Sequence, residues 1–521
     1  MIDTKKEQER DELHRAIWAI ADELRGAVDG WDFKNYVLGT MFYRYISENL
    51  CNYVNSGEIN AGNTDFDFAK MADENAEEAR EGLVEEKGFF ILPSELFCNV
   101  RANAADDENL NETLERVFRH IEESAKGSEA ERDFAGLFDD YDVNSNKLGS
   151  TVAKRNEKLV KLLNGVGEMK LGDVKDHSID AFGDAYEYLM MMYASNAGKS
   201  GGEFFTPADV SELLTRLGTV GKTEINKVYD PACGSGSLLL KAEKVLGKDA
   251  IRNGFYGQEI NITTYNLCRI NMFLHDVGFD KFNIACEDTL ISPQHWDDEP
   301  FELIVSNPPY SIKWAGDENP LLINDPRFAP AGVLAPKSKA DMAFIMHSLS
   351  WLASNGTAAI VCFPGIMYRG GAEQKIRKYL VDNNYVDCII QLPSNLFFGT
   401  SIATCIMVMK KNKTDNKTLF IDATNECVKV TNNNKLTPEH IEHIVDAFTK
   451  REEVKHFAHL ASYEEVSGND YNLSVSTYVE AEDTGEKIDI VKLNAEIKEI
   501  VASEQVLRDE IDKIIAEIEV G

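Results

Sequence analysis

The chain has 521 residues, more than one compact hydrophobic core holds, so two or three domains are expected. Lysine and arginine total 54 against 88 aspartate and glutamate, which gives a formal net charge of -34. This balance excludes a protein that grips nucleic acid by its overall charge, because basic side chains supply most non-specific affinity for phosphates, although it still allows a local basic groove.

Cysteine usage and apolar runs exclude two further classes of protein. The nine cysteines are spread singly, without Cys-x-x-Cys spacing or a nearby histidine pair, so we expect neither a metal site nor a disulfide framework. There is no secretory signal, and no apolar run approaches the roughly 18 residues that a membrane-spanning helix needs. We therefore expect a cytoplasmic protein that does not enter a membrane.

The first part of the chain has helical spacing, and we predict an N-terminal helical domain over residues 1-170. Apolar residues recur every three or four positions on both sides of a break at Asp29-Gly30: Leu13, Ile17, Ile20 and Leu24, then Val37, Met41, Phe42 and Ile46. Two interpretations stay open. The domain is either a cap that stabilises the rest or a clamp that touches nucleic acid or a second copy of the chain.

A strand, a small-residue loop and a helix follow one another from Val228. Val228-Tyr229-Asp230 ends the strand, Pro231-Ala232-Cys233-Gly234-Ser235-Gly236-Ser237 forms the loop, and Leu238-Leu239-Leu240 lies in the helix. Glycines 234 and 236 let the backbone approach a ligand, and the helix N-terminus behind them favours an anion. The spacing is neither that of a dinucleotide-binding fold nor that of a phosphate loop, and a plain tight turn is the alternative.

Two more predicted strands end in acids. Gly254 to Glu259 forms the second strand, and Phe282 to Cys286 forms the third, which Glu287-Asp288 follows. An acid after the second strand commonly accepts hydrogen bonds from both ribose hydroxyls, and an acid after the third is placed to reach an adenine amino group. One such acid is more often a helix cap, but acids at three successive strand ends indicate a ligand site.

The fourth strand, Phe301 to Ser306, runs into Asn307-Pro308-Pro309-Tyr310. An exocyclic amino group such as adenine N6 is a poor nucleophile, so a site that methylates it must accept both of its N–H hydrogens. The Asn307 carboxamide and the Pro308 carbonyl suit that task, and two prolines hold them rigidly. Tyr310 offers a ring on which an extruded base stacks. On these four residues alone, a turn after a strand fits equally well.

Three further apolar runs complete the predicted sheet: Ala358 to Phe363, Tyr385 to Ile390 and Ala403 to Met409. The result is an α/β fold with a Rossmann-like sheet of seven strands, in which ligands bind outside the carboxyl ends of parallel strands. The strand-end acids and Asn307 then share one edge. We place this catalytic domain at residues 171-411 and an acidic extension at 412-485, which leaves no room for a large domain that recognises a target sequence.

The last segment, residues 486-521, carries an apolar seam on a predicted helix. Its members follow spacings of three and four, interrupted once at Glu504: Ile490, Leu493, Ile497, Ile500, Leu507, Ile511, Ile514 and Ile518. Such a seam must be covered. We expect an intermolecular, coiled-coil-like bundle because the connecting stretch is polar, and packing back onto the same chain is the alternative.

In this order, the motifs resemble the S-adenosylmethionine-dependent DNA adenine-N6 methyltransferases and, more narrowly, the modification (M) subunit of type I restriction-modification systems. Four further stretches resemble the same subunit: Ile17 to Gly26, Phe182 to Leu189, Tyr368 to Glu373 and Asn469 to Leu473. The resemblance implies methyl transfer from S-adenosylmethionine to N6 of a flipped-out adenine in double-stranded DNA. The product protects host DNA from restriction.

The resemblance also implies a role for each motif residue. The cofactor-binding residues lie before the predicted helix at 208 and at the strand ends: Glu203, Phe204, Phe205, Thr206, Pro207, Ala208, Asp230, Gly234, Ser235, Gly236, Ser237, Glu259 and Asp288. The residues at the target amino group are Asn307, Pro308, Pro309 and Tyr310. Glu259 corresponds to the ribose acid and Asp288 to the adenine contact, whereas Glu203 to Ala208 closes over the methionine end or is simply a hydrophobic staple.

An M subunit works with a separate specificity (S) subunit that reads the DNA sequence, which agrees with the acidic charge. The resemblance also implies a second M subunit, a restriction (R) helicase-nuclease subunit, and the long helices of S as the partner of the terminal seam. Two rival readings stay open. The Asn-Pro-Pro-Tyr motif also occurs in methyltransferases for glutamine side chains of translation factors and for structured RNA, and a non-enzymatic scaffold could retain the same fold.

Overall fold

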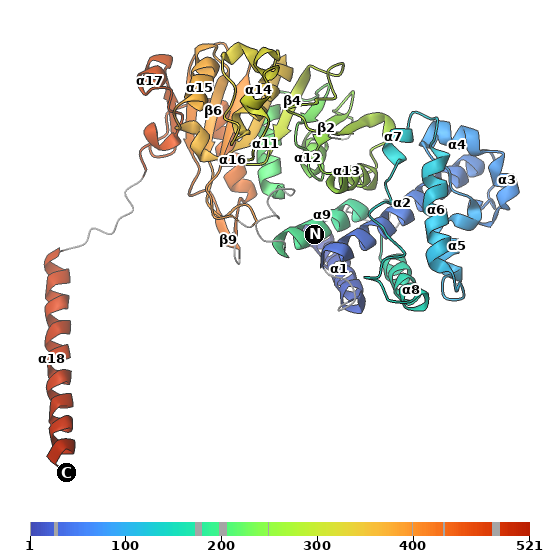
Figure 1. Cartoon of the computed structure of the whole chain (residues 1–521), viewed down its shortest axis with the longest axis horizontal. Coiled ribbons are helices and arrows are strands. Elements are labelled where there is room, and N and C mark those ends of the chain that lie inside the picture. Colours follow the sequence, from blue (N-terminus) through green and yellow to red (C-terminus); the bar gives the residue numbers. More distant parts are fainter. Residues whose placement is uncertain are drawn as a thin grey trace. The chain divides into compact units, whose positions relative to one another are not determined.

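The computed structural model describes residues 2–24, 30–171, 180–196, 206–247, 249–398, 400–430, 433–481 and 490–520 (Figure 1). The chain divides into two compact units, Met1–Val479 and Glu480–Gly521. Across those described ranges, no helix is long and apolar enough to cross a membrane.

The N-terminal part is helical, as predicted. Its helices are α1 (Ile2–Leu24), α2 (Gly30–Asn60), α3 (Asp73–Glu77), α4 (Arg80–Lys87), α5 (Phe97–Asn103), α6 (Leu110–Ser124), α7 (Glu131–Phe134) and α8 (Val152–Glu168). The apolar positions predicted for the first two helices are buried: Leu13, Ile17, Ile20, Val37, Met41, Phe42 and Ile46. The side chain of Leu24 lies outside the described set.

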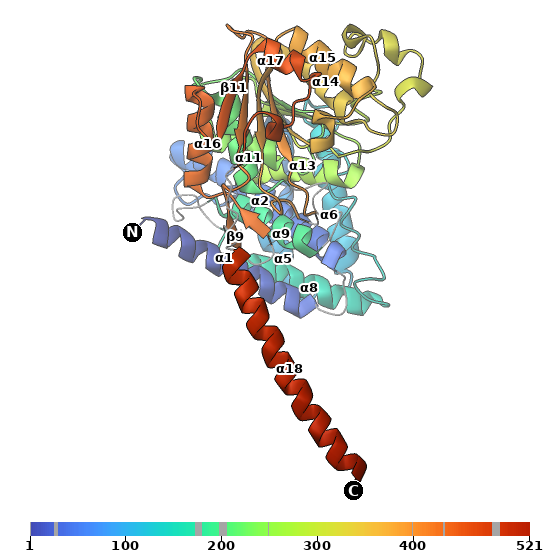
Figure 2. The ribbon, with the colours of Figure 1, turned by 90° about the vertical axis from the view of Figure 1, so that its left-hand side faces the viewer.

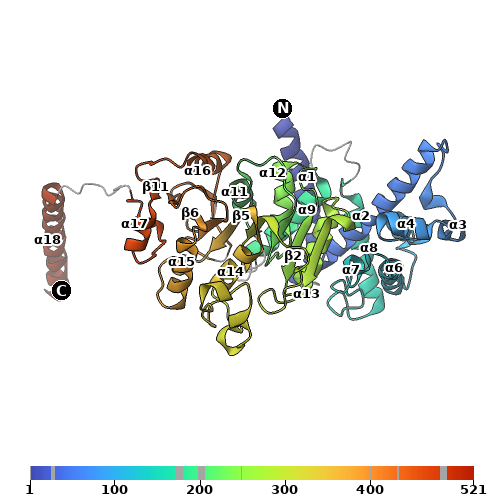
Figure 3. The same ribbon diagram turned by 90° about the horizontal axis from the view of Figure 1, so that it is seen from above.

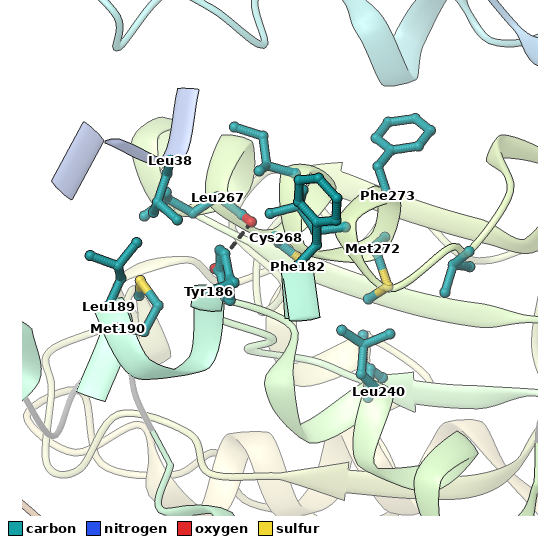
Figure 4. Packing of buried hydrophobic residues seen from close by; sticks show 14 of the residues in the cluster. Leu38, Phe182, Tyr186, Leu189, Met190, Leu240, Leu267, Cys268, Met272 and Phe273 are labelled. Atoms are coloured by element: carbon teal, nitrogen blue, oxygen red, sulfur yellow. Dashed lines mark hydrogen bonds between the residues drawn. The ribbon is translucent and has the colours of Figure 1, made fainter. Parts of the chain in front are cut away.

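Helix α9 (Ala181–Asn196) joins this helical part to the sheet. Its Tyr186 and Leu189 side chains face Leu38 of α2 and Leu267 of α13 (Ile262–Leu274), and the Tyr186 hydroxyl donates to the Leu267 carbonyl over 3.2 Å (Figure 4). These residues belong to one continuous buried cluster. Asp140 adds polar contacts by accepting hydrogen bonds from two side chains of α13. The two predicted domains therefore share one core.

All seven predicted strands are present: β1 (Val228–Asp230), β2 (Phe255–Glu259), β3 (Phe282–Cys286), β4 (Phe301–Ser306), β5 (Leu352–Cys362), β6 (Val386–Gln391) and β7 (Cys405–Lys410). They lie in the order β3-β2-β1-β4-β5-β7-β6. Neighbours pair in parallel except β7, which is antiparallel to both β5 and β6. The predicted Rossmann-like α/β arrangement is confirmed.

Alternating strand residues pack against helices on the two faces of the sheet. Leu303 and Val305 contact the cluster of α11 (Ala208–Thr219), α12 (Ser237–Leu246) and α13, while Ile304 contacts that of α14 (Asp341–Trp351) and α15 (Ala372–Asp382). Figure 3 shows α11 on one side of the strands and α14 and α15 on the other.

The described residues also form eight short 3-10 turns: η1 (Phe68–Lys70), η2 (Pro93–Glu95), η4 (Phe279–Lys281), η5 (Gly316–Glu318), η6 (Leu322–Asn324), η7 (Ala329–Ala331), η8 (Pro364–Met367) and η9 (Val475–Thr477).

The predicted acidic extension is not separate from the sheet. It contains β8 (Thr418–Asp422), β9 (Val428–Val430), β10 (Asn433–Lys435), α16 (Pro438–Lys450), β11 (Ala458–Ala461) and α17 (Tyr463–Gly468). β8 pairs in parallel with β6, and β11 pairs antiparallel with β8. Within the described residues the sheet thus has nine strands, two more than predicted, because the buried run Leu419 to Ile421 continues the hydrophobic layer beyond β6.

The second unit contains a single described helix, α18 (Ile490–Val520). Each of the eight predicted seam residues is at least 44% exposed. All described side chains of this helix are exposed, so its apolar seam is uncovered within this unit.

Candidate active site

The carboxyl ends of four strands carry the predicted site residues. Because β3, β2, β1 and β4 pair in parallel, those ends lie along one edge of the sheet. Asp230 and Glu259 are the last residues of β1 and β2, Asp288 follows β3, and Asn307 follows β4. The predicted common edge is confirmed.

Asp230 connects the first strand to the fourth. Its Oδ1 accepts hydrogen bonds from the Ser306 hydroxyl at 2.7 Å and from the Ala232 N–H at 3.0 Å. The side chain is 1% exposed, and burial raises the pKa of its carboxyl group to about 7. Asp230 thus positions the loop after β1 relative to Asn307 to Tyr310, which we call the target motif. Ser306 was not predicted, since a serine inside an apolar strand carries no functional signal.

The loop after β1 is narrow because two glycines adopt left-handed backbone angles, with φ of 53° at Gly234 and 78° at Gly236. A Cβ on Gly236 would lie 2.7 Å from the Cys268 sulfur of α13. Cys233 is buried against the same sulfur at 4.0 Å, and the Cys268 thiol and burial raise the pKa of Cys233 well above its ordinary value. A thiol in this state fills space and is not an activated nucleophile.

Two serines complete this loop. The Ser235 carbonyl accepts a hydrogen bond from Asn271 of α13 at 2.9 Å, and the Ser235 and Ser237 hydroxyl oxygens lie 3.1 Å apart. Ser237 begins α12, which has no side-chain cap. The first-turn N–H groups of that helix are therefore available to an anionic ligand.

The Glu259 carboxylate faces the same loop. Its Oε2 accepts the Gly234 N–H at 3.1 Å, and its Oε1 accepts the Asn261 N–H at 2.9 Å. Burial raises the pKa of this carboxyl group. The two backbone donors fix its orientation, and each oxygen keeps a lone pair for a further donor such as a ribose hydroxyl.

Asp288 lies at the start of a turn. Its Oδ1 accepts the N–H groups of Leu290 at 2.9 Å and Ile291 at 3.3 Å, the pattern of a capping carboxylate. The neighbouring Thr289 hydroxyl donates to the Pro231 carbonyl at 2.6 Å and ties this turn to the loop after β1. Asp288 is thus brought to the loop after β1, and its capping role is compatible with a ligand contact.

The Asn307 carboxamide is held on both sides. Its Nδ2 donates to the Thr206 hydroxyl at 3.2 Å, and its Oδ1 accepts the Tyr310 hydroxyl at 2.5 Å. Pro207 and Ala208 follow at the start of α11. The segment before the sheet therefore touches the target motif, while Glu203, Phe204 and Phe205 lie outside the described residues.

Tyr310 is more constrained than the sequence suggests. Its ring is half-buried against the core and its hydroxyl is bonded to Asn307, and burial raises the pKa of the phenol well above its ordinary value. The hydroxyl uses one of the two lone pairs on the Asn307 oxygen and leaves the other free. Of the two residues that separate Asn307 from Tyr310 in the sequence, Pro308 is buried and Pro309 is half-buried.

One further residue holds the target motif and was missed from the sequence. Asp341, at the start of α14, accepts the Ser311 N–H on both carboxylate oxygens at 3.2 and 3.0 Å. Ser311 has a φ of 53°, which serine rarely adopts, so this anchor fixes a strained turn directly after Tyr310. Ser311 and Asp341 are 30 positions apart in the chain, so no local sequence pattern predicts this hydrogen bond.

Comparison with known proteins identifies the family. The family model described as N-6 DNA Methylase matches residues 177–487, and the model described as HsdM N-terminal domain matches residues 13–166. The chain is 49% identical to the methylase subunit of the type I restriction enzyme MpnII of Mycoplasma pneumoniae, over 100% of this chain and 98% of the relative.

More distant proteins agree. The MjaIX methylase subunit of Methanocaldococcus jannaschii is 27% identical over 97% of this chain and 91% of its own length. A crystal structure of the type I restriction-modification methyltransferase subunit of Streptococcus thermophilus superposes with a TM-score of 0.82 at 37% identity, covering 90% of this chain and all of the other. The chain therefore belongs to the N-6 DNA methylase family, among the methylase subunits of type I restriction enzymes.

Proposed function

We propose that this chain transfers a methyl group from S-adenosylmethionine to N6 of adenine in DNA, at a site chosen by a separate specificity subunit. The observation that carries the proposal is the Asn307 carboxamide, which hydrogen bonds fix at the carboxyl edge of the sheet beside the cofactor loop. Membership of the N-6 DNA methylase family supports the same reaction.

The strand-end residues fit S-adenosylmethionine. The Glu259 carboxylate is oriented by two backbone donors, which suits a ribose diol, and the uncapped start of α12 suits the carboxylate of an amino acid. We assign Asp288 to the adenine of the cofactor. We place the segment from Thr206 to Ala208 at the side of the cofactor site that adjoins Asn307. When bound, the cofactor supplies an activated methyl group. The involvement of Glu203 to Phe205 stays a prediction.

On the side of the protein, catalysis rests on acceptors. The free lone pair of Asn307 Oδ1 accepts one N6 hydrogen, and the Pro308 carbonyl accepts the other. With both hydrogens held, the nitrogen lone pair points out of the ring plane towards the incoming methyl group. No side chain has to act as a nucleophile, so the rate enhancement comes from positioning. Tyr310, fixed by its hydroxyl, provides the stacking surface for the flipped base.

The assembly follows from the charge and the terminal helix. A chain of net charge -34 needs a partner for much of its DNA grip, and the exposed seam of α18 offers an apolar surface to the helices of an S subunit. We assign the helical domain to residues 1-170, the methyltransferase domain to 171-411 with two extra strands from 412-485, and association to 486-521. A second M subunit, an R subunit and a cytoplasmic location stay predictions.

The test is a methyl-acceptor assay with tritiated S-adenosylmethionine and the full-length chain. DNA, structured RNA and a translation release factor are offered in parallel, with and without the S subunit. We expect label in DNA alone, recovered as N6-methyladenine, and only when S is present. Label in RNA or protein, or on another base, would refute the proposal. Asn307→Ala in the same mixture controls for contaminating methyltransferases.

A further inference from the structure

Two cations lie near the loop that carries the target motif. Asp341 anchors that loop by accepting a hydrogen bond from the Ser311 N–H. A second carboxylate, Glu373, is the second residue after Gly371. Burial raises the pKa of both carboxyl groups, while Arg369 and Lys339 lower the pKa of both. The geometry agrees: Arg369 lies 3.6 Å from Glu373, and Ala340, the neighbour of Lys339, donates its N–H to the Ile312 carbonyl at 2.9 Å, directly after Ser311.

The Arg369 side chain is fixed in place but not fully bonded. Its guanidinium carbon lies 4.9 Å from the centroid of the Phe363 ring. A Cβ on Gly365 would lie 2.4 Å from its Nη2, so only glycine leaves room for the guanidinium here. Its Nη1 is buried and faces the buried Glu373 carboxylate at 3.6 Å, whereas its Nε and Nη2 are not buried and make no hydrogen bond within the described residues. The side chain is 24% exposed.

Other buried arginines of the chain show what a structural role looks like. Arg327 donates to the Thr289 and Leu290 carbonyls and to Asp325, and Arg377 donates to the Ile366 and Tyr471 carbonyls. Both are 1% exposed. Arg369 differs because its orientation is set by a ring, a glycine and the Glu373 carboxylate, while Nε and Nη2 of its partly exposed guanidinium keep their N–H donors unused within the described residues.

The position of Arg369 matches the target site. The loop that holds it follows the carboxyl end of β5, which pairs in parallel with β4, so it lies on the same edge as Asn307. Its neighbour Tyr368 is 59% exposed. The segment between β4 and α14, which carries Lys339 next to its last residue, protrudes from the body in Figure 2. This region therefore borders the edge at which Asn307 would receive a base.

We propose that Arg369, together with Lys339, binds a backbone phosphate of DNA next to the adenine that Asn307 holds. The inference rests on the proposed function and deepens it. A planar guanidinium with unused N–H groups suits the tetrahedral phosphate, and its prior fixation lowers the entropy lost on binding. The contact is local, which explains how a chain of net charge -34 approaches DNA at the reacting base.

The experiment uses the full-length chain assembled with its S subunit and duplexes that carry one neutral methylphosphonate at a time around the target adenine. In the wild type, one flanking position should weaken DNA binding roughly tenfold. Arg369→Gln should weaken binding to unmodified DNA by a similar factor and be insensitive to that same position. The slope of log Kd against log salt should fall by about one. Cofactor affinity should not change.

Two variants control for the fold and the charge. Gly365→Ala keeps the positive charge but displaces the guanidinium, and we expect it to reproduce the loss. Arg252→Gln removes an arginine that also pairs with a glutamate, Glu224, but precedes β2 at the opposite edge, and we expect wild-type binding. If Arg369→Gln keeps the wild-type methylphosphonate pattern and salt slope, the inference is wrong. If the wild-type complex methylates no DNA, the proposed function itself fails.

Discussion

The carboxyl edge of the sheet and the helix α18 hold their functional groups in opposite ways. At the edge, Asp230, Glu259 and Asn307 each make at least two hydrogen bonds within the chain. Along α18, every seam residue is at least 44% exposed. The edge is organised before any ligand arrives, whereas the helix has an apolar surface still to be covered. Catalytic geometry and assembly should therefore be separable by mutation.

The largest effect is expected from removal of the helix. A chain that ends before Asp489 should lose association with the S subunit completely and keep its affinity for S-adenosylmethionine, because the loss is confined to the seam. Analytical ultracentrifugation and calorimetry measure the two properties. A sharper version is Ile497→Asp with Ile511→Asp, for which Lys498→Asp with Asp512→Lys, outside the seam, is the control. A truncated chain that still assembles a DNA-methylating complex would contradict the separation.

Asn307→Ala addresses the edge from the catalytic side. Methyl transfer should fall by more than tenfold, because the variant loses one of two acceptors for the target amino group, while cofactor affinity and assembly with S persist. Single-turnover methylation measures the chemical step apart from binding. Near-normal turnover would remove Asn307 from the mechanism, and loss of assembly would show that edge and helix are coupled after all.

Glu259→Ala should have a smaller effect than Asn307→Ala, and the effect should fall on cofactor binding rather than on the rate of methyl transfer. We expect cofactor affinity to weaken by roughly tenfold, as for the loss of a charge-assisted hydrogen bond, and the rate at saturating cofactor to change less. Isothermal calorimetry gives the affinity directly. Glu287→Ala, which removes the exposed acid after β3, is the matched control. Equal affinities for wild type and Glu259→Ala would count against the ribose assignment.

The smallest effect concerns Asp230 and appears in stability rather than activity. Because burial raises its pKa from 3.8 to about 7, the folded state holds this proton more tightly than the unfolded state. The stability that this group contributes is complete below its unfolded pKa and is lost as the pH rises through its folded pKa. Between about pH 4 and about pH 7, the Asp230→Asn variant should therefore lose less stability than the wild type. Parallel pH profiles of Tm for the two proteins would exclude the raised pKa.

Much of the sheet is predictable from the sequence because each core strand is a short apolar run that stops at a turn or an acid. β8 and β11 are different. The run Leu419 to Ile421 stands between polar segments, and β11 is only Ala458–Ala461 with His459 inside it. Its strand character comes from pairing with β8, a non-local interaction that no local pattern records.

The candidate site likewise contains some residues that the sequence predicts and others that it does not. Asp230, Glu259 and Asn307 are found because parallel strands bring their ends to one edge, whatever the loops do. The anchors of that site depend on loop conformation. Asp341 reaches Ser311 only through a left-handed turn, and Ser306 reaches Asp230 only through the neighbouring strand. The hydrogen bond from Tyr310 to Asn307 likewise depends on a side-chain rotamer that the motif leaves open.

Helix α9 carries a consequence for how the protein melts. Since its buried side chains pack on α2 and on α13 at once, the helical part and the sheet cannot lose their packing independently (Figure 4). Heating should therefore produce one cooperative heat-absorption peak for residues up to Val479, with equal calorimetric and van't Hoff enthalpies. A protease that cuts between the helical part and the sheet would then leave two fragments that stay together and release enthalpy only as a pair.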